Sequence, residues 1–350
     1  VGLLECLKAF GFERKKGARF IKGGEVCNFD FSKKHTKGWD WTWQVPRADF
    51  DNVLTKELIK KDIDIAFEHE VIDVVFNENG MSKTTLRDKG GATSTINANY
   101  IIDSSGYGRV LPRLLDLEIP SALPKHSSIF AHVKDIKRPE GKEGTLITFD
   151  VIDTQTWLWV IPFSNGVTSI GYVGTTEYIE SFEGSNTERL VEMLKLSTYF
   201  HERFKDVGFL FEPKSIKNYS KSVKQLYGKG YALTGNSAEF LDPIFSSGVT
   251  LATESALLAA KLITKEANNE AVDWEKHYSN YIKKGVDVFS TYVKEWYTGN
   301  LQVLFFHRPE NLEIKKQICA VLSGYVWDET NPFVKKHNKI IQNLAHFIKL

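Results

Sequence analysis

The spacing of apolar residues predicts an α/β fold for the first third of the chain. Residues 47–59 carry apolar side chains at helical spacing, with aspartates in the first turns, where a carboxylate suits the helix dipole. Asn79 and Gly80 supply hairpin turn chemistry between two of the runs that follow. Four short β-branched or apolar runs predict strands, at residues 63–67, 71–76, 84–87 and 100–103. This order predicts a parallel sheet with an appended antiparallel piece.

The pattern changes between about residues 127 and 175, where strands follow one another without helices. The predicted strands are residues 129–133, 145–150, 156–161 and 167–173. They imply a separate, mostly antiparallel sheet. The elements predicted beyond it are a helix at 188–202, a strand at 231–234, a long apolar helix at 248–264 and an aromatic-rich helical region at 273–350.

These changes of pattern predict four segments along the chain. Residues 1–126 and 231–270 would form one α/β domain, which an antiparallel domain at residues 127–230 interrupts. Residues 271–350 would form a C-terminal helical region. The chain opens without Met, inside an amphipathic helix that has no N-cap residue before it. We therefore expect further residues upstream of Val1.

Composition excludes several classes of protein. With 350 residues, 42% of them hydrophobic and 25% charged, the chain can bury a substantial core. The 45 Lys and Arg residues balance 44 acidic residues, so no global field favours nucleic acid or an anionic membrane as the main partner. The three cysteines are too widely spaced for a disulfide framework or a metal pair, and no apolar run approaches the roughly 18 residues of a membrane span. We expect a cytoplasmic protein without a metal site.

Two turns could hold a dinucleotide. Gly106 and Gly108 follow the predicted strand at 100–103 but lack the third glycine of G-x-G-x-x-G, and such a lone match is more often an ordinary turn. Residues 235–249 are more specific, because a strand runs into a small-residue turn and then into a loop whose Ser and Gly precede a helix. Backbone N–H groups converge at that helix start and can bind an anion or a polarised carbonyl. A capped helix with a proline-containing loop is the alternative.

Residues 235–249 resemble the C-terminal FAD motif of the flavin monooxygenase superfamily, in the form found in phenol and pyrrole halogenases. The resemblance implies a Rossmann-like FAD/NAD(P)-binding domain, with the start of the motif near the ribityl chain and phosphates. Pro243 and residues 246–249 would lie against the isoalloxazine, where family members also hold chloride. Asn236 replaces the common Asp, and Arg47 opens a segment similar to the family's R-x-x-F-D helix start. The expected cofactor-binding residues are Arg47, Asp103, Gly106, Gly235, Asn236, Asp242, Pro243, Ser246, Ser247, Gly248 and Val249.

Trp157 and Trp159 share one face of a predicted strand, because their spacing is two. Alone, such a pair is more often core or interface packing. The run Trp157–Pro162 matches the W-x-W-x-I-P motif of the flavin-dependent halogenases at every fixed position. The resemblance implies that these rings keep substrate away from the flavin, which separates halogenation from hydroxylation. A similar spacing at residues 39–46 is interpreted as structural.

Lys15 lies in a segment, residues 12–20, that resembles the halogenase segment with the lysine that receives the activated halogen. Taken alone, a lysine between Arg14 and Lys16 is more often a solvated surface residue. The chemistry requires a desolvated amine, and neighbouring cations would lower its pKa. We therefore expect Lys15, Trp157 and Trp159 to form the catalytic set.

Phe245 marks a departure from one branch of the family. Tryptophan halogenases carry a Glu immediately before the S-x-G element, whereas this chain has an apolar ring there. A base that helps to deprotonate an indole is therefore not available from that position. Phenols and pyrroles need it less, because their own heteroatom donates electron density, and free tryptophan becomes an unfavourable substrate.

Together the motifs predict an FAD-dependent halogenase. A separate flavin reductase would supply reduced FAD, oxygen would give a C4a-hydroperoxide, and chloride or bromide would be oxidised to a hypohalous species that Lys15 presents to an electron-rich ring. The substrate would be a small phenol or pyrrole, either free or bound to a carrier protein. Two alternatives stay open: a flavin hydroxylase or dehydrogenase on the same scaffold, and a non-catalytic protein-docking module.

Overall fold

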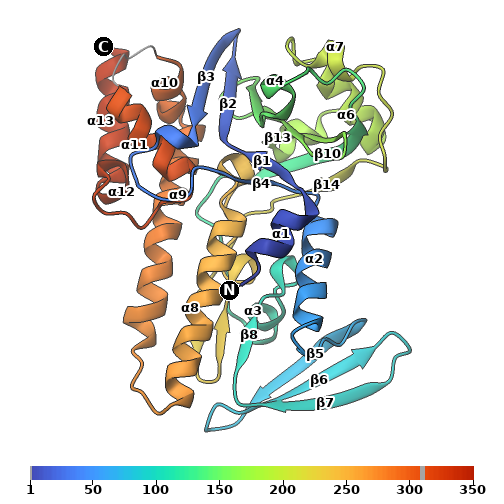
Figure 1. Ribbon diagram of the computed structural model, residues 1–350, viewed down its shortest axis with the longest axis vertical. Helices are drawn as coiled ribbons and strands as arrows, with labels where there is room; N and C mark the ends of the chain where they lie inside the picture. Colours follow the sequence, from blue (N-terminus) through green and yellow to red (C-terminus); the bar gives the residue numbers. More distant parts are fainter. Residues whose placement is uncertain (1, 308–311) are drawn as a thin grey trace. The chain divides into compact units, whose positions relative to one another are not determined.

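The computed structural model describes residues 2–307 and 312–350 (Figure 1). The chain divides into two compact units, each built from separate stretches of sequence. Unit 1 contains Val1–Lys61, Pro124–Tyr219 and Thr291–Leu350, and unit 2 contains Asp62–Leu123 and Ser220–Ser290. In the described ranges, no helix is both long and apolar enough to cross a membrane. The division into functional domains expected from the sequence stays a prediction.

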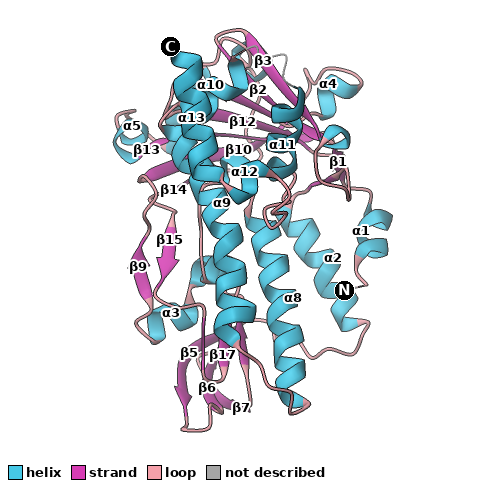
Figure 2. Ribbon diagram, turned by 90° about the vertical axis from the view of Figure 1, so that its left-hand side faces the viewer, coloured by secondary structure: helices cyan, strands magenta, loops and turns pink. Residues whose placement is uncertain are grey.

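The sheet of unit 1 has seven strands among the described residues, in the order β14-β10-β13-β12-β11-β2-β3 (Figure 2). Neighbouring strands are antiparallel except for β2 and β11, which are parallel. A short ribbon of β1 and β4 stands apart from this sheet. The strands are β1 (Glu13–Lys15), β2 (Gly17–Lys22), β3 (Glu25–Asp30), β4 (Thr42–Gln44), β10 (His126–Lys134), β11 (Thr148–Val151), β12 (Trp157–Pro162), β13 (Val167–Thr175) and β14 (Lys214–Ile216).

One face of this sheet contributes to a hydrophobic core cluster of unit 1. Leu158 of β12 and Tyr172 of β13 are fully buried there, together with Met193 and Phe204 from the helical segments. The described helices of unit 1 are α1 (Leu4–Phe10), α2 (Arg47–Ile59), α4 (Lys142–Thr145), α5 (Thr176–Glu180), α6 (Asn186–Leu194), α7 (His201–Phe204), α10 (Asn300–Phe306), α11 (Leu312–Leu322), α12 (Pro332–Lys335) and α13 (His337–Lys349). Helix α9 (Asn280–Tyr297) runs from unit 2 into unit 1.

The predicted antiparallel sheet is confirmed by β10 to β13, but its extent was underestimated. Strands β2 and β3 join it through the parallel pairing of β2 with β11, which residue periodicity does not reveal. The predicted helix at 188–202 is wrong as one element, because α6 ends at Leu194 and α7 begins at His201. Ser197 explains the break: its Oγ accepts the N–H of Phe200 and donates to the buried Asp150.

Unit 2 combines small sheets with a long helix. Strands β5, β6 and β7 form an antiparallel sheet, whereas β8 and β17 are parallel neighbours, so the fold is mixed α/β. The strands are β5 (His69–Phe76), β6 (Ser82–Asp88), β7 (Thr93–Ala98), β8 (Ile101–Asp103), β9 (Glu118–Pro120), β15 (Lys221–Val223), β16 (Tyr227–Gly228) and β17 (Tyr231–Leu233). The helical elements are α3 (Val110–Leu114), α8 (Gly248–Ala267), the π-helix η5 (Glu275–Ser279) and the 3₁₀ turns η2 (Gly106–Gly108), η3 (Gly235–Ser237) and η4 (Pro243–Phe245).

The predicted strand at residues 63–67 is wrong. None of the described strands pairs with this segment, and Ile63 and Phe67 are 50% and 60% exposed. A β-branched run favours extended backbone, but a strand exists only where a neighbour accepts and donates its hydrogen bonds. The predicted hairpin is confirmed, because β5 and β6 are antiparallel and Gly80 takes the left-handed conformation at the turn, with φ of +86°.

Candidate functional site

Two turns of unit 2 lie side by side because the strands before them are parallel neighbours. β8 pairs with β17, so the turns at Gly106 and Gly235 leave the same edge of the sheet. The turns are tied together at the carbonyl oxygen of Asp103, which accepts Thr234 N at 2.9 Å and Ser237 Oγ at 2.6 Å. The structure thus brings the two predicted dinucleotide turns into one site.

The carboxylate of Asp103 shapes the first of these turns. One oxygen accepts Ser105 N at 2.7 Å, and the other accepts Leu111 N at 2.8 Å. The side chain is buried, and both of its oxygens bond to backbone of its own loop. Gly106 follows with φ of +59°, a conformation that favours glycine. Asp103 therefore holds the backbone that a cofactor would meet.

Arg109 joins the two turns and was missed by sequence reasoning. Its side chain is buried, and Nη1 donates to Asn236 O at 3.1 Å. Nη2 donates to Ser222 O at 2.8 Å, and Nε pairs with Glu118 at 2.6 Å. The residue follows the Gly106 turn directly, but two of its partners lie more than 100 residues away in sequence, so only the tertiary structure identifies them.

Gly235 is required at the start of the second turn. Its φ is +55°, and a Cβ on this residue would lie 2.9 Å from Cβ of Ala252 on α8. Its N–H donates to Ser255 Oγ of the same helix at 3.0 Å. The turn therefore packs directly on α8, and only a residue without a side chain permits this approach.

The second turn leads to the N-terminus of α8. Asp242 accepts Ile244 N at 3.0 Å and caps the turn that contains Pro243. Ser246 then takes a left-handed φ of +54°, and α8 begins at Gly248 without a side-chain cap at Ser247. The end of the predicted motif therefore leads into a helix whose N-cap residue, Ser247, offers no side-chain acceptor to the first N–H groups.

This helix start fits a flavin. Ser246 and Val249 are exposed, Gly248 is half-buried, and a Cβ on Gly248 would meet nothing closer than Asn236 Oδ1 at 3.9 Å. Uncapped N–H groups at the start of the 20-residue helix α8 suit a polarised carbonyl or an anion, and the Asn236 amide adds a neutral polar group beside them. The residues present can therefore hold the pyrimidine edge and ribityl chain of FAD.

Glu239 is a second residue of this site that the sequence did not single out. Burial raises the pKa of its carboxyl to about 7, although Ser222 Oγ donates to it at 2.7 Å and Arg109 favours its charged form. A carboxyl with this pKa exchanges its proton near neutral pH. No motif marks it, because the motif specifies no residue type at this position between Gly235 and Asp242.

Lys15 of unit 1 is buried, contrary to what its cationic neighbours suggest. It is 8% exposed, and the Phe31 ring centroid lies 5.9 Å from Nζ. Among the described residues, no carboxylate or hydrogen-bond acceptor contacts its amine. Desolvation lowers the pKa of Lys15 to about 8, so the amine loses its proton closer to neutral pH than a solvated lysine does.

Trp157 and Trp159 lie on one face of β12, as predicted, with ring centroids 6.0 Å apart. Trp157 is fully buried, and its Nε1 donates to the hydroxyl of Tyr297 at 3.0 Å. Trp159 is half-buried and donates to Ser169 Oγ at 3.1 Å. Its ring covers Gly171 on β13, where a Cβ would lie 2.4 Å from the indole. Both rings are therefore fixed in orientation by hydrogen bonds.

The other predicted residues have simpler surroundings. Arg47 belongs to unit 1, is exposed, and pairs with Asp51 at 3.1 Å across one helical turn. Phe245 is buried in unit 2, so this position presents an apolar ring. In residues 39–46, whose tryptophan spacing resembles that of Trp157 and Trp159, the guanidinium carbon of Arg14 packs 4.7 Å from the Trp41 ring centroid. The cofactor role of Arg47 stays a prediction.

Comparison with known families identifies the class of the protein. The family model described as tryptophan halogenase matches residues 16–341. The chain belongs to this halogenase family. It is therefore an enzyme of the flavin-dependent halogenase and oxidoreductase class, and the resemblance inferred from its motifs is confirmed.

Several halogenases resemble this chain along most of its length. A 1H-pyrrole-2-carbonyl-[peptidyl-carrier protein] chlorinase of Pseudomonas fluorescens is 26% identical, over 93% of this chain and 78% of the relative. A tryptophan 2-halogenase of Chondromyces crocatus is 30% identical, over 74% of this chain and 50% of the relative.

Solved structures carry the same fold. A flavoprotein/dehydrogenase from Cytophaga hutchinsonii matches with a TM-score of 0.97 at 45% identity, covering 99% of this chain and 85% of that protein. The halogenase PltM, whose structure contains phloroglucinol and FAD, matches with a TM-score of 0.71 at 18% identity, covering 97% of this chain and 67% of PltM.

Replacing Arg109 with lysine is expected to weaken FAD binding about tenfold or more and to lower the free energy of unfolding by about 3 kcal/mol. One ammonium cannot replace the three directed contacts of the guanidinium, so partly buried carbonyl oxygens lose their donors. Flavin fluorescence quenching and denaturant unfolding measure the two effects. The exposed Arg113→Lys is the control, which should behave like the wild type. Unchanged FAD affinity in Arg109→Lys would contradict the role of Arg109.

Proposed function

We propose that this protein halogenates a small, electron-rich aromatic ring of the phenol or pyrrole type, with FAD reduced by a separate reductase and with chloride or bromide as the halide. In this proposal unit 2 is a Rossmann-like FAD-binding domain, and the proposed catalytic lysine and the tryptophan pair belong to unit 1. The observation that carries the proposal is the buried amine of Lys15, which has no carboxylate partner among the described residues.

The lysine suits halogen delivery because its amine is desolvated. FAD, when bound, supplies the oxygen-activating chemistry that oxidises the halide. A neutral or partly neutral Lys15 Nζ accepts or shares a proton with a hypohalous acid and holds its halogen toward the ring, which a solvated ammonium would not do. An ion pair would instead keep the amine fully protonated. The burial of Lys15 is therefore a functional requirement of this proposal.

The tryptophan pair suits the separation of halogenation from hydroxylation. Trp159 is held by Ser169 and lies over Gly171, so its ring cannot turn away from the sheet without losing both contacts. Trp157 is held by Tyr297 in the same way. Two large, fixed rings exclude water and keep an aromatic substrate from direct contact with an oxidant.

The proposed substrate class rests on Phe245, which stands where tryptophan halogenases carry a glutamate. Phe245 offers no base, so the ring must carry a heteroatom that makes it nucleophilic without one. Phenols and pyrroles meet this condition. The chlorinase of Pseudomonas fluorescens and a brominase of Pseudoalteromonas luteoviolacea, 23% identical over 94% of this chain, are named for pyrrole rings on a carrier protein, which supports testing both free and carrier-bound rings.

The proposal is tested by mass spectrometry of products formed from a phenol or a pyrrole with FAD, a flavin reductase, oxygen and chloride or bromide. We expect products with the isotope pattern of one added halogen, and none when the halide is omitted. Products with added oxygen and no halogen would contradict the proposal. The match to a flavoprotein/dehydrogenase makes a flavin hydroxylase or dehydrogenase the second candidate, and the same experiment would detect it.

A further inference from the structure

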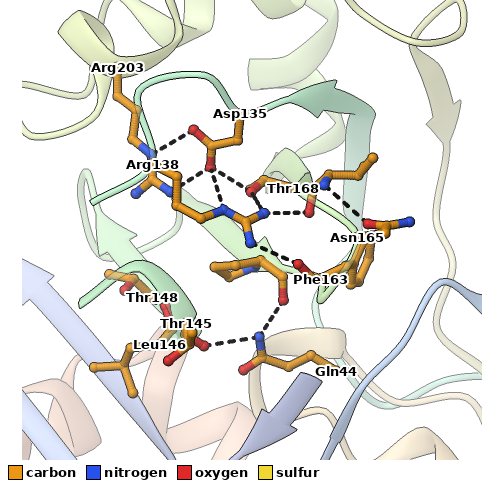
Figure 3. A network of polar contacts seen from close by, with 12 residues as sticks. Gln44, Asp135, Arg138, Thr145, Leu146, Thr148, Phe163, Asn165, Thr168 and Arg203 are labelled. Carbon is orange, nitrogen blue, oxygen red and sulfur yellow. Dashed lines mark hydrogen bonds and ion pairs between the residues drawn. The ribbon is translucent and has the colours of Figure 1, made fainter. Parts of the chain in front are cut away.

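Gln44 of β4 carries a buried amide whose orientation is fixed. The side chain is 4% exposed, and Nε2 donates to Pro162 O at 2.6 Å and to Thr145 O at 3.2 Å (Figure 3). Two carbonyl oxygens around one end of the amide require that end to be the nitrogen, because carbonyl oxygens cannot donate. Pro162 is the last residue of the W-x-W-x-I-P strand, so Gln44 is anchored to that motif.

The other end of this amide has no partner. Oε1 of Gln44 is buried, and among the described residues nothing donates to it. Gln302 shows how a buried glutamine is normally satisfied in this protein: its Nε2 also donates to two backbone carbonyls, of Thr154 and Trp296, while its Oε1 accepts Lys22 Nζ at 2.9 Å. Buried acceptors rarely stay unpaired in native proteins, so Gln44 Oε1 is poised for a donor from outside the chain.

Gln44 and Lys15 share one face of the ribbon formed by β1 and β4. Glu13 pairs with Gln44 and Lys15 pairs with Thr42 in antiparallel register. Side chains two residues apart on a strand point to the same side, so Lys15 and Gln44 are diagonal neighbours on that side. Both are buried, whereas Arg14 on the opposite side is exposed. Thr42 on the same side is exposed, so the orphan acceptor and the desolvated amine are two buried groups on a face that is open at Thr42.

We propose that Gln44 is a specificity-determining residue whose Oε1 accepts a hydrogen bond from the O–H or N–H of the aromatic substrate and so orients the ring beside Lys15. This inference rests on the proposed function. The ligand must be a donor, because a carbonyl oxygen repels a halide or any other anion. Phenols and pyrroles carry one such donor on the heteroatom that activates the ring, so one hydrogen bond selects the substrate and sets which carbon faces the amine.

The test compares phenol with anisole, in which a methyl group replaces the donor hydrogen. Binding to the protein loaded with oxidised FAD is measured by ligand-observed NMR, without turnover. The wild type should bind phenol at least about tenfold more tightly than anisole, the range expected for one buried hydrogen bond. In Gln44→Met this preference should fall below about twofold. Gln302→Met also removes an amide that donates to two backbone carbonyl oxygens, and it should keep the wild-type preference.

Two results would overturn the inference. One is equal binding of phenol and anisole by the wild type, as expected if a water molecule fills the acceptor; this result needs no variant and so does not depend on how Gln44→Met folds. The other is an undiminished preference in a Gln44→Met protein that still unfolds cooperatively. Failure of the proposed function would look different, because then the wild type would form no halogenated product from any ring, whatever the binding preference.

Discussion

Lys15→Met is expected to abolish halogenation and, at the same time, to make the protein more stable. Halogenated product should fall at least about a hundredfold, the scale of a positioned acid or base group, while oxygen consumption by reduced FAD continues. Methionine fills a similar volume without a charge. Because burial lowers the Lys15 pKa from 10.5 to about 8, removal of the amine should raise the free energy of unfolding at pH 7 by about 3 kcal/mol.

The difference in unfolding free energy between Lys15→Met and the wild type should depend on pH in a defined direction. Between about pH 8 and pH 10.5 the unfolded chain binds more protons at this lysine than the folded chain, so the stability of the wild type rises with pH in that window. Lys15→Met lacks this rise. The stability difference between the two proteins should therefore shrink from pH 8 upward and vanish above pH 10.5.

Denaturant unfolding at several pH values measures this effect, and product analysis measures the loss of halogenation. Lys16→Met is the matched control, because Lys16 is the exposed neighbour in sequence and its removal should change neither stability nor activity appreciably. A Lys15→Met protein that is less stable than the wild type at pH 7 would show that the amine is not desolvated, and one that still halogenates would show that the amine is not required for halogenation.

Gly235→Ala is expected to lose FAD binding almost completely. The new Cβ would lie 2.9 Å from Cβ of Ala252, and the left-handed φ of +55° adds conformational strain. The turn must then move away from α8, which displaces Asn236 and the helix start that would hold the cofactor. We expect FAD affinity to fall at least about a hundredfold and the free energy of unfolding to fall by more than about 2 kcal/mol.

Gly91→Ala separates the steric effect from the conformational one. Gly91 also has a left-handed φ, of +87°, but a Cβ there would meet nothing within 4 Å. This variant should lose only about 1 kcal/mol and bind FAD normally. Flavin fluorescence quenching and denaturant unfolding give both quantities for both variants. If Gly235→Ala bound FAD as well as Gly91→Ala does, the second turn would not be part of the cofactor site.

Patterns of short range determined much of the architecture from the sequence. Alternation over a few residues located β10, β12 and β13, and it placed Trp157 and Trp159 on one face. Apolar periodicity located α2 and α8. The turn at Gly235 was also predictable, because a small-residue turn between a strand and a helix is a local feature. In each case the physical cause lies within one element.

Features that depend on distant partners could not be read from the chain. The extended run at 63–67 finds no strand partner, whereas β2 finds one in β11. Arg109 joins the two turns through carbonyl oxygens of residues more than 100 positions away in the sequence. These outcomes depend on which backbone groups meet after the chain has folded, and periodicity contains no information about that.

The candidate site also contains features that the sequence predicted and features that required the tertiary structure. The sequence by itself nominated the residues that we propose for it: the lysine before β2, the paired tryptophans and the glycine turn before α8, recognisable by spacing and by family resemblance. Only the tertiary structure decided that Lys15 is desolvated and that Oε1 of Gln44, on the same side of the ribbon of β1 and β4, has no donor among the described residues. The reason is that solvation and hydrogen-bond satisfaction are properties of packed neighbours, which no single stretch of sequence contains.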